Sequence, residues 1–149
     1  MMPAHLKWAR GRRGNVLVEF ALGFSVLFAC LSGVFQYGYT MYIYNSLEAA
    51  VTSAAMYAAR ATYDTRNSSF DTAVKNMAVY GNTSGTGQVL VPGLSTGNIT
   101  ISRSPASGVP ATVTVSVTSL TVNAVFRQFN FAGKPSVTAS FSGEYFTSP

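Results

Sequence analysis

The chain has 149 residues, of which 48% are hydrophobic and only 10% are charged. Its formal net charge of +5 arises largely from four basic residues in the first 13 positions, and the other basic residues are scattered singly, so no nucleic-acid-binding face is predicted. The lone histidine, His5, and the lone cysteine, Cys30, offer no pair for a metal site or a disulfide. The acids beyond residue 62, Asp64, Asp71 and Glu144, show no paired spacing. We therefore predict neither an enzyme nor a bound cofactor.

The first predicted element is a membrane-spanning helix. A basic segment, residues 1–14, precedes an apolar run that starts at Asn15, and Glu19 is the only charged residue from there to Leu47. About 20 apolar residues are enough to cross a bilayer. The positive-inside rule then places the N-terminus in the cytoplasm and the remainder of the chain on the other side of the membrane.

A cleaved secretory signal also begins with basic residues and an apolar core. Its core spans only about 7 to 15 residues and ends in small residues, whereas here the apolar pattern continues through Tyr44. A spanning helix fits this length better, and a generic signal anchor remains the alternative.

Glu19 is the anomaly of this helix. A carboxylate inside a membrane costs several kcal/mol unless another group pairs with it, so it marks a functional position. If the chain were cut after Gly14, the new α-amino group at Asn15 would be mostly cationic at pH 7 and could pair with Glu19 of a neighbouring copy. A Glu19 side chain that extends to the membrane face is the alternative.

Small residues recur every fourth position of the same helix, which lets a second helix approach closely along one stripe. They are Ala21, Ser25, Ala29 and Gly33. Tyrosines follow between 37 and 44, as is typical of an outer membrane interface. The membrane exit is therefore expected near residues 36–45.

Beyond this exit, Leu47, Val51, Ala54 and Ala58 keep the helical period, so one helix is expected over residues 15–62, roughly 70 Å long at 1.5 Å per residue. A second, short helix is predicted over residues 69–80. The capping residues at 67–69 open it, an apolar face carries Phe70, Val74, Met77 and Ala78, and the glycine-rich segment 81–87 ends it.

The last part of the chain alternates apolar and hydroxyl side chains. Val113, Val115 and Val117 alternate with Thr and Ser, and the phase shifts at Leu120 and Val122, which predicts a bulge or bend.

A second alternating segment begins at Val137. We predict two long strands joined by a connection at 127–134 into an antiparallel hairpin, a third strand at 98–103 and a candidate fourth at 89–91. Such a small sheet needs a helix over its apolar face. The predicted fold is α+β: a basic segment 1–14, a long helix 15–62 and an outer α+β domain 63–149, in which the helix packs on a small antiparallel sheet.

The segment from Arg12 to Leu22, Arg-Arg-Gly-Asn-Val-Leu-Val-Glu-Phe-Ala-Leu, resembles the start of TadE-like minor pilins of tight-adherence (Flp) systems. The resemblance extends through the tyrosine-rich stretch 37–44 and the small-residue run up to Arg60. It covers the first 60 residues well and the rest loosely.

The resemblance implies roles for single residues. Gly14 would be the last leader residue, Asn15 the first mature one, Glu19 the carboxylate that governs assembly and Phe20 its neighbour. It also implies a bacterial inner-membrane location with a periplasmic or extracellular outer domain. The implied partners are a prepilin peptidase, the major pilin, other minor pilins and the proteins of the pilus assembly platform.

Two functional hypotheses follow. The first is a structural subunit, a minor pilin or pseudopilin that is processed at Gly14 and helps to assemble or prime a type IVb pilus for surface adherence. The second is a single-pass membrane protein whose outer domain binds an envelope ligand. The mass of the mature protein distinguishes them.

Overall fold

The computed structural model describes residues 9–66, 68–105, 108–124 and 126–146. The chain divides into two compact units, residues 1–38 and 39–149. Helix α1 (Ala9–Arg60) contributes to both. It begins before the predicted Asn15 and ends two residues before Thr62.

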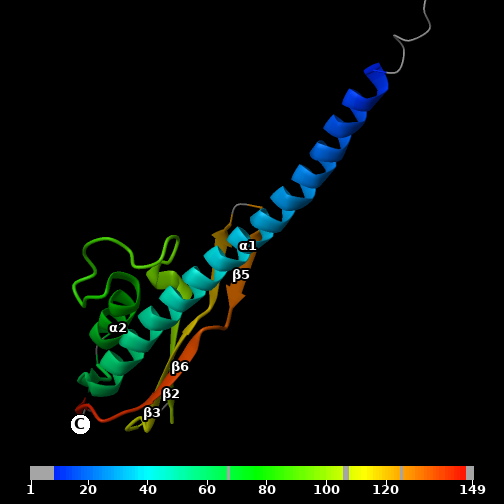
Figure 1. Ribbon diagram of the computed structural model, residues 1–149. Coiled ribbons are helices and arrows are strands. Elements are labelled where there is room, and N and C mark those ends of the chain that lie inside the picture. Colours follow the sequence, from blue (N-terminus) through cyan, green and yellow to red (C-terminus); the bar gives the residue numbers. More distant parts are fainter. Residues whose placement is uncertain (1–8, 67, 106–107, 125, 147–149) are drawn as a thin grey trace, which may run out of the picture. The chain divides into compact units, whose positions relative to one another are not determined.

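The N-terminal unit is the first part of α1, drawn in blue in Figure 1. Every side chain from 14 to 31 is exposed. Phenylalanines one turn apart stack along this helix, with ring centroids 6.2 Å apart for Phe20 and Phe24 and 6.3 Å apart for Phe24 and Phe28. The unit therefore has no core of its own among the described residues.

The C-terminal unit has its core between α1, helix α2 (Ser69–Tyr80) and the strands. α1 contributes a stripe of buried residues at the helical period: Ile43, Leu47, Ala50, Val51, Ala54, Ala55, Ala58 and Ala59. α2 has the predicted bounds and buries Phe70, Val74 and Ala78 as predicted, together with Val79. Met77 is only half-buried.

The ends of α2 are formed by backbone groups. Of the predicted capping residues, Asn67 lies outside the described residues and Ser68 makes no side-chain cap hydrogen bond. The Ser68 carbonyl accepts bonds from the backbone N–H and the hydroxyl of Thr72, both at 3.0 Å. At the other end Gly81 adopts a left-handed φ of 72° and donates its N–H to the Met77 carbonyl. This conformation favours glycine.

The main sheet is antiparallel with strand order β2, β3, β6: β2 (Ile99–Ser104), β3 (Thr112–Val117) and β6 (Ser136–Ser140). It follows a short 3₁₀ helix, η1 (Thr96–Asn98). The inward valines of β3 are fully buried, as their alternation predicts. The third predicted strand is β2, and β3 does pair with β6.

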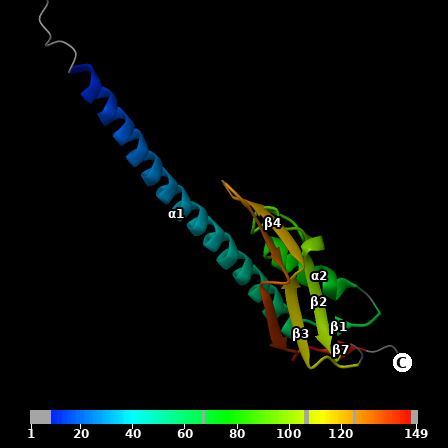
Figure 2. The ribbon, with the colours of Figure 1, turned by 90° about the vertical axis from the view of Figure 1, so that its right-hand side faces the viewer.

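Two predictions for the strands were wrong. Residues 127–134 are not a connection, because they contain β5 (Gln128–Ala132), which pairs antiparallel with β4 (Ser119–Asn123). A separate hairpin, visible in Figure 2, thus lies between β3 and β6 in the chain. The phase shift at Leu120 follows a bend at Thr118, where the chain passes from one sheet to the other, so of the predicted bulge or bend the structure has the bend.

Residues 89–91 form no strand, although Val91 is fully buried and the Leu90 N–H bonds to the Val79 carbonyl at 2.8 Å. Their short apolar run reflects packing of a loop on the core. The unit closes with a parallel pair between β1 (Tyr63–Asp64) and β7 (Tyr145–Phe146). The fold is α+β, as predicted.

Candidate functional site

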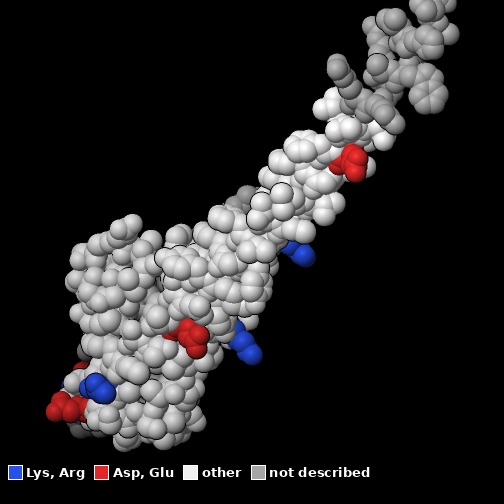
Figure 3. Space-filling view, in the orientation of Figure 1, with Lys and Arg blue, Asp and Glu red and all other residues white. Residues whose placement is uncertain are grey.

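The predicted functional residues all lie in the N-terminal unit, on the exposed part of α1. The segment that starts at Gly14 is long and apolar enough to cross a membrane, and none of its most apolar stretch is buried. Figure 3 shows this part of the surface as white apart from one acidic side chain. An exposed apolar surface of this extent requires lipid or protein around it.

Gly14 and Asn15 lie inside a helical turn and are exposed. A Cβ atom added at Gly14 would meet nothing within 4 Å, and the same holds for Gly23, Gly33 and Gly38. Glycine within a helix is less stable than alanine by about 1 kcal/mol. Packing within the described chain therefore gives no reason for these glycines.

Glu19 and Phe20 are neighbours on the exposed helix surface. Phe20 is 69% exposed, and Glu19 has no hydrogen-bond or ion-pair partner within the described part of the chain. The structure therefore leaves the carboxylate available to a group outside the chain.

The small-residue stripe is also exposed, at Ala21, Ser25, Ala29 and Gly33. The Ser25 hydroxyl donates to the Ala21 carbonyl at 2.8 Å, so its polar group is satisfied within the helix. Cys30 beside the stripe is exposed too. No part of the described chain packs against this stripe.

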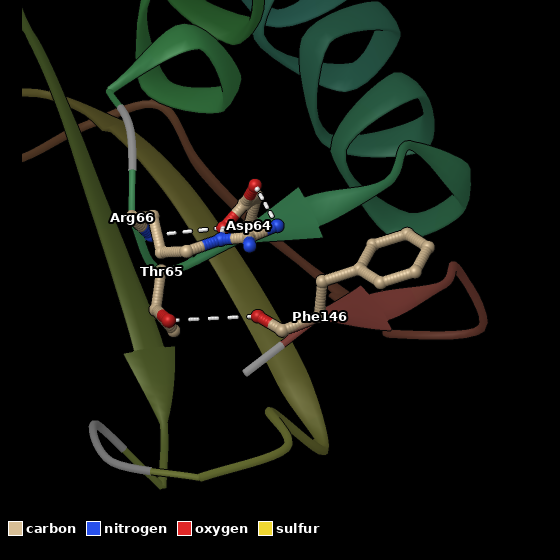
Figure 4. Close-up of polar contacts among 4 residues, drawn as sticks. All are labelled: Asp64, Thr65, Arg66 and Phe146. Carbon is tan, nitrogen blue, oxygen red and sulfur yellow. Dashed lines mark hydrogen bonds and ion pairs between the residues drawn. The ribbon is translucent and has the colours of Figure 1, made fainter. Parts of the chain in front are cut away.

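The sequence analysis missed a polar cluster in the C-terminal unit, around the pair β1 and β7. Arg66 donates two side-chain hydrogen bonds to the carboxylate of Asp64, each 2.9 Å, and its backbone N–H adds a third of 2.9 Å (Figure 4). The Thr65 hydroxyl reaches the Phe146 carbonyl at 3.5 Å. The side-chain hydrogen bonds from Arg66 lower the pKa of Asp64 and raise that of Arg66.

Arg103 of β2 lies deeper in the same cluster and forms an ion pair with Asp71 of α2. Its guanidinium carbon is 4.5 Å from the ring centre of Tyr63 and 5.1 Å from that of Phe70, which are cation–π distances. An open cavity of about 350 Å³ lies beside these residues. Because Arg103 joins β2 to α2, the cluster has a structural role. Its residues are far apart in the sequence, so local sequence patterns could not reveal their contacts.

The second missed feature is the outer face of the main sheet. All of its outward positions carry Ser or Thr, and the Thr114 and Thr138 hydroxyls bond across strands at 2.7 Å. The positions are Thr100, Ser102, Ser104, Thr112, Thr114, Ser116, Ser136, Thr138 and Ser140. Alternation along each strand could have revealed this uncharged face. No group of three or more metal-binding side chains occurs among the described residues.

Comparison with known proteins gives one match. The model of the TadE-like protein family matches residues 14–56. No curated protein and no solved structure matches the chain. The matched segment begins at Gly14 and includes Glu19, the small-residue stripe and the first buried turns of α1. The resemblance to TadE-like proteins is therefore confirmed over residues 14–56.

Proposed function

We propose that this chain is a minor pilin, or pseudopilin, that is anchored in the inner membrane by α1, is processed after Gly14, and takes part in assembling or priming a Tad pilus. The observation that carries the proposal is the exposed helix: 18 consecutive residues, 14–31, are exposed in a segment that matches the TadE-like family. This surface needs partners, and a filament subunit finds them first in lipid and then in neighbouring subunits.

The glycines support the same proposal. Gly14 stands at the junction between the basic and the apolar segments, where a glycine leaves the backbone open to a peptidase and makes the helix easier to unwind. Gly33 and the other residues of the small-residue stripe allow close approach of a second helix. Within the described chain none of these residues has a packing role.

Glu19 gives the proposal a mechanism for register. Cleavage after Gly14 creates an ammonium group at Asn15, and a copy displaced along the filament brings that group to Glu19 of its neighbour. A buried ion pair contributes little net stability, but it strongly disfavours arrangements that leave either charge unpaired. The proposed partners are accordingly the prepilin peptidase, the major pilin, other minor pilins and the assembly platform, with the C-terminal unit outside the cytoplasm.

The first test is N-terminal sequencing of the protein extracted from membranes. The mature chain should start at Asn15, and Gly14→Val should leave the precursor uncut. Gly11→Val is the matched control, because it changes another glycine of the basic segment and should be processed normally. An intact N-terminus in the wild-type protein would contradict the proposal and favour the single-pass envelope protein.

The second test concerns assembly. Glu19→Ala should still be inserted and processed, but crosslinking to the major pilin should be lost, because the new amine would remain buried without a partner. Glu48→Ala changes the next acid of the same helix, which is exposed in the C-terminal unit, and should crosslink normally. Normal crosslinking of Glu19→Ala would remove the role assigned to this carboxylate.

A further inference from the structure

The hairpin formed by β4 and β5 runs along α1 toward the N-terminal end of its unit. Two contacts fix this direction. The strands of the main sheet are tied to the C-terminal end of α1, because the Ser142 N–H, just after β6, donates to the Ala59 carbonyl at 2.7 Å. The hairpin instead contacts an earlier part of α1, where the Phe131 ring of β5 lies 6.0 Å from the Tyr44 ring. Moving from the first contact to the second follows α1 backward, and both ribbon views show the hairpin continuing in that direction (Figures 1 and 2).

The tip of the hairpin reaches the level at which the unit begins. Gln128, the first residue of β5, precedes Phe131 by three residues and lies closer to the tip by about 10 Å along the strand. The same length of helix contains about seven residues. Counted from Tyr44, this distance extends past Tyr42 to at least Tyr39, the first residue of the unit.

The residues at this tip have the chemistry of a membrane interface. Phe126 is 60% exposed and is followed by the exposed Arg127. An aromatic ring beside an arginine suits the interfacial zone, where the ring enters the acyl boundary and the guanidinium binds lipid phosphate. At the same level α1 carries tyrosines, which are typical of a membrane interface.

We propose that Phe126 and Arg127 form a second membrane contact, with the tip of the hairpin inserted in the outer interface of the bilayer. This inference rests on the proposed anchoring of α1 in the membrane. The tip lies at the level of the first residue of its unit and carries the charge that attracts phosphate. A single helix leaves the attached unit able to rotate about the helix axis, whereas a second contact at the side of the helix fixes that rotation.

The experiment uses the full chain in bilayers that contain phospholipids brominated near the top of the acyl chain. The sequence has one tryptophan, Trp8, so a Trp8→Phe background allows one reporter at a time. Phe126→Trp should lose most of its emission to the bromine atoms. Phe146→Trp is the matched control, because Phe146 is also exposed but belongs to β7, next to the far end of α1, and its emission should be unaffected.

Phe35→Trp separates the two proposals, because it reports on α1 alone and lies next to the expected membrane exit, at the depth of the bromine atoms. Quenching at Phe35→Trp without quenching at Phe126→Trp would overturn the second contact and leave the anchor intact. Absence of quenching at Phe35→Trp would overturn both. Arg127→Glu combined with Phe126→Trp should reduce the quenching in anionic bilayers, and unchanged quenching would remove Arg127 from the contact.

Discussion

The two parts of α1 use similar residues for opposite purposes. Leu27 in the N-terminal unit is 57% exposed, whereas Leu47 in the C-terminal unit is completely buried by the same chain. Along the second part the apolar residues form a narrow stripe that α2 and the strands cover. Along the first part they occur on all sides, and nothing in the described chain covers them. The second part of α1 thus contributes to the core of the C-terminal unit, whereas the first part exposes its apolar side chains.

The largest effect should come from cutting α1 at different points. A chain that begins at Tyr39 should fold, because it retains every residue of the core. A chain that begins at Asp64 should be molten or aggregated, because it lacks Leu47, Val51 and the buried alanines. Two-dimensional NMR should give dispersed peaks for the first chain and collapsed peaks for the second. Dispersed spectra from the shorter chain would show that α1 is dispensable for the core.

Truncating one leucine in each half gives a finer test. Leu47→Ala should lower the free energy of unfolding by about 2 to 5 kcal/mol, since it removes a fully buried side chain. Leu27→Ala should change it by no more than about 0.5 kcal/mol, since the side chain is 57% exposed and belongs to no core. Urea titration of the full chain in detergent micelles, followed by tyrosine circular dichroism, measures both. Equal losses would contradict the division at Gly38.

The glycines offer a matched pair as well. A Cβ atom at Gly143 would lie 2.2 Å from the Ala61 carbonyl oxygen, so Gly143→Ala should force the C-terminal segment away from the end of α1 and lower stability by about 1 to 3 kcal/mol. Gly33→Ala meets nothing and should leave the melting temperature of the C-terminal unit unchanged. Thermal unfolding of both variants measures these effects. A lower melting temperature for Gly33→Ala would indicate an intramolecular contact at Gly33.

The smallest expected effect is electrostatic and confined to the C-terminal unit. Because Arg66 lowers the pKa of Asp64 below its ordinary value of 3.8, the pair stabilises the folded state above that pH and loses this contribution as the pH falls through the lowered pKa. The pair is at the surface, so the contribution is small. Melting temperatures between neutral and acid pH should therefore fall slightly more for the wild type than for Arg66→Ala. If both proteins showed the same pH dependence of the melting temperature, the Asp64–Arg66 pair would not contribute to stability.

Features set by local periodicity could be predicted from the sequence. The bounds of α2, the buried valines of β3 and the buried stripe of α1 all follow from the spacing of apolar residues along one element. The role of residues 128–132 could not be predicted, because Phe129 and Phe131 gain their pattern only by pairing with β4. The cluster around Arg103 was missed for a similar reason, since its partners Tyr63 and Asp71 come from other elements.

The candidate site divides in the same way. The sequence alone singled out Gly14, Glu19 and the small-residue stripe as candidates, because a charge or a small residue within an apolar run can be recognised without the structure. The hairpin tip has no such mark, since Phe126 and Arg127 reach the level of Tyr39 only when β4 and β5 fold back along α1. The sequence pattern therefore predicted the apolar helix, while the position of the tip depended on tertiary structure.

The pairing of β1 with β7 has a consequence for the order of events in the life of the chain. Residues 63 and 145 are partners, and Ser142 joins Ala59 across 83 positions, so the final residues complete contacts begun by the end of the first helix. A ribosome releases the chain N-terminus first, so α1 is complete long before residues 142–146 are made. The C-terminal unit therefore cannot complete these contacts until residue 146 has been made. Until then its strands are exposed to proteases and to strands of other copies. The yield of folded protein should therefore depend on how fast the chain is synthesised.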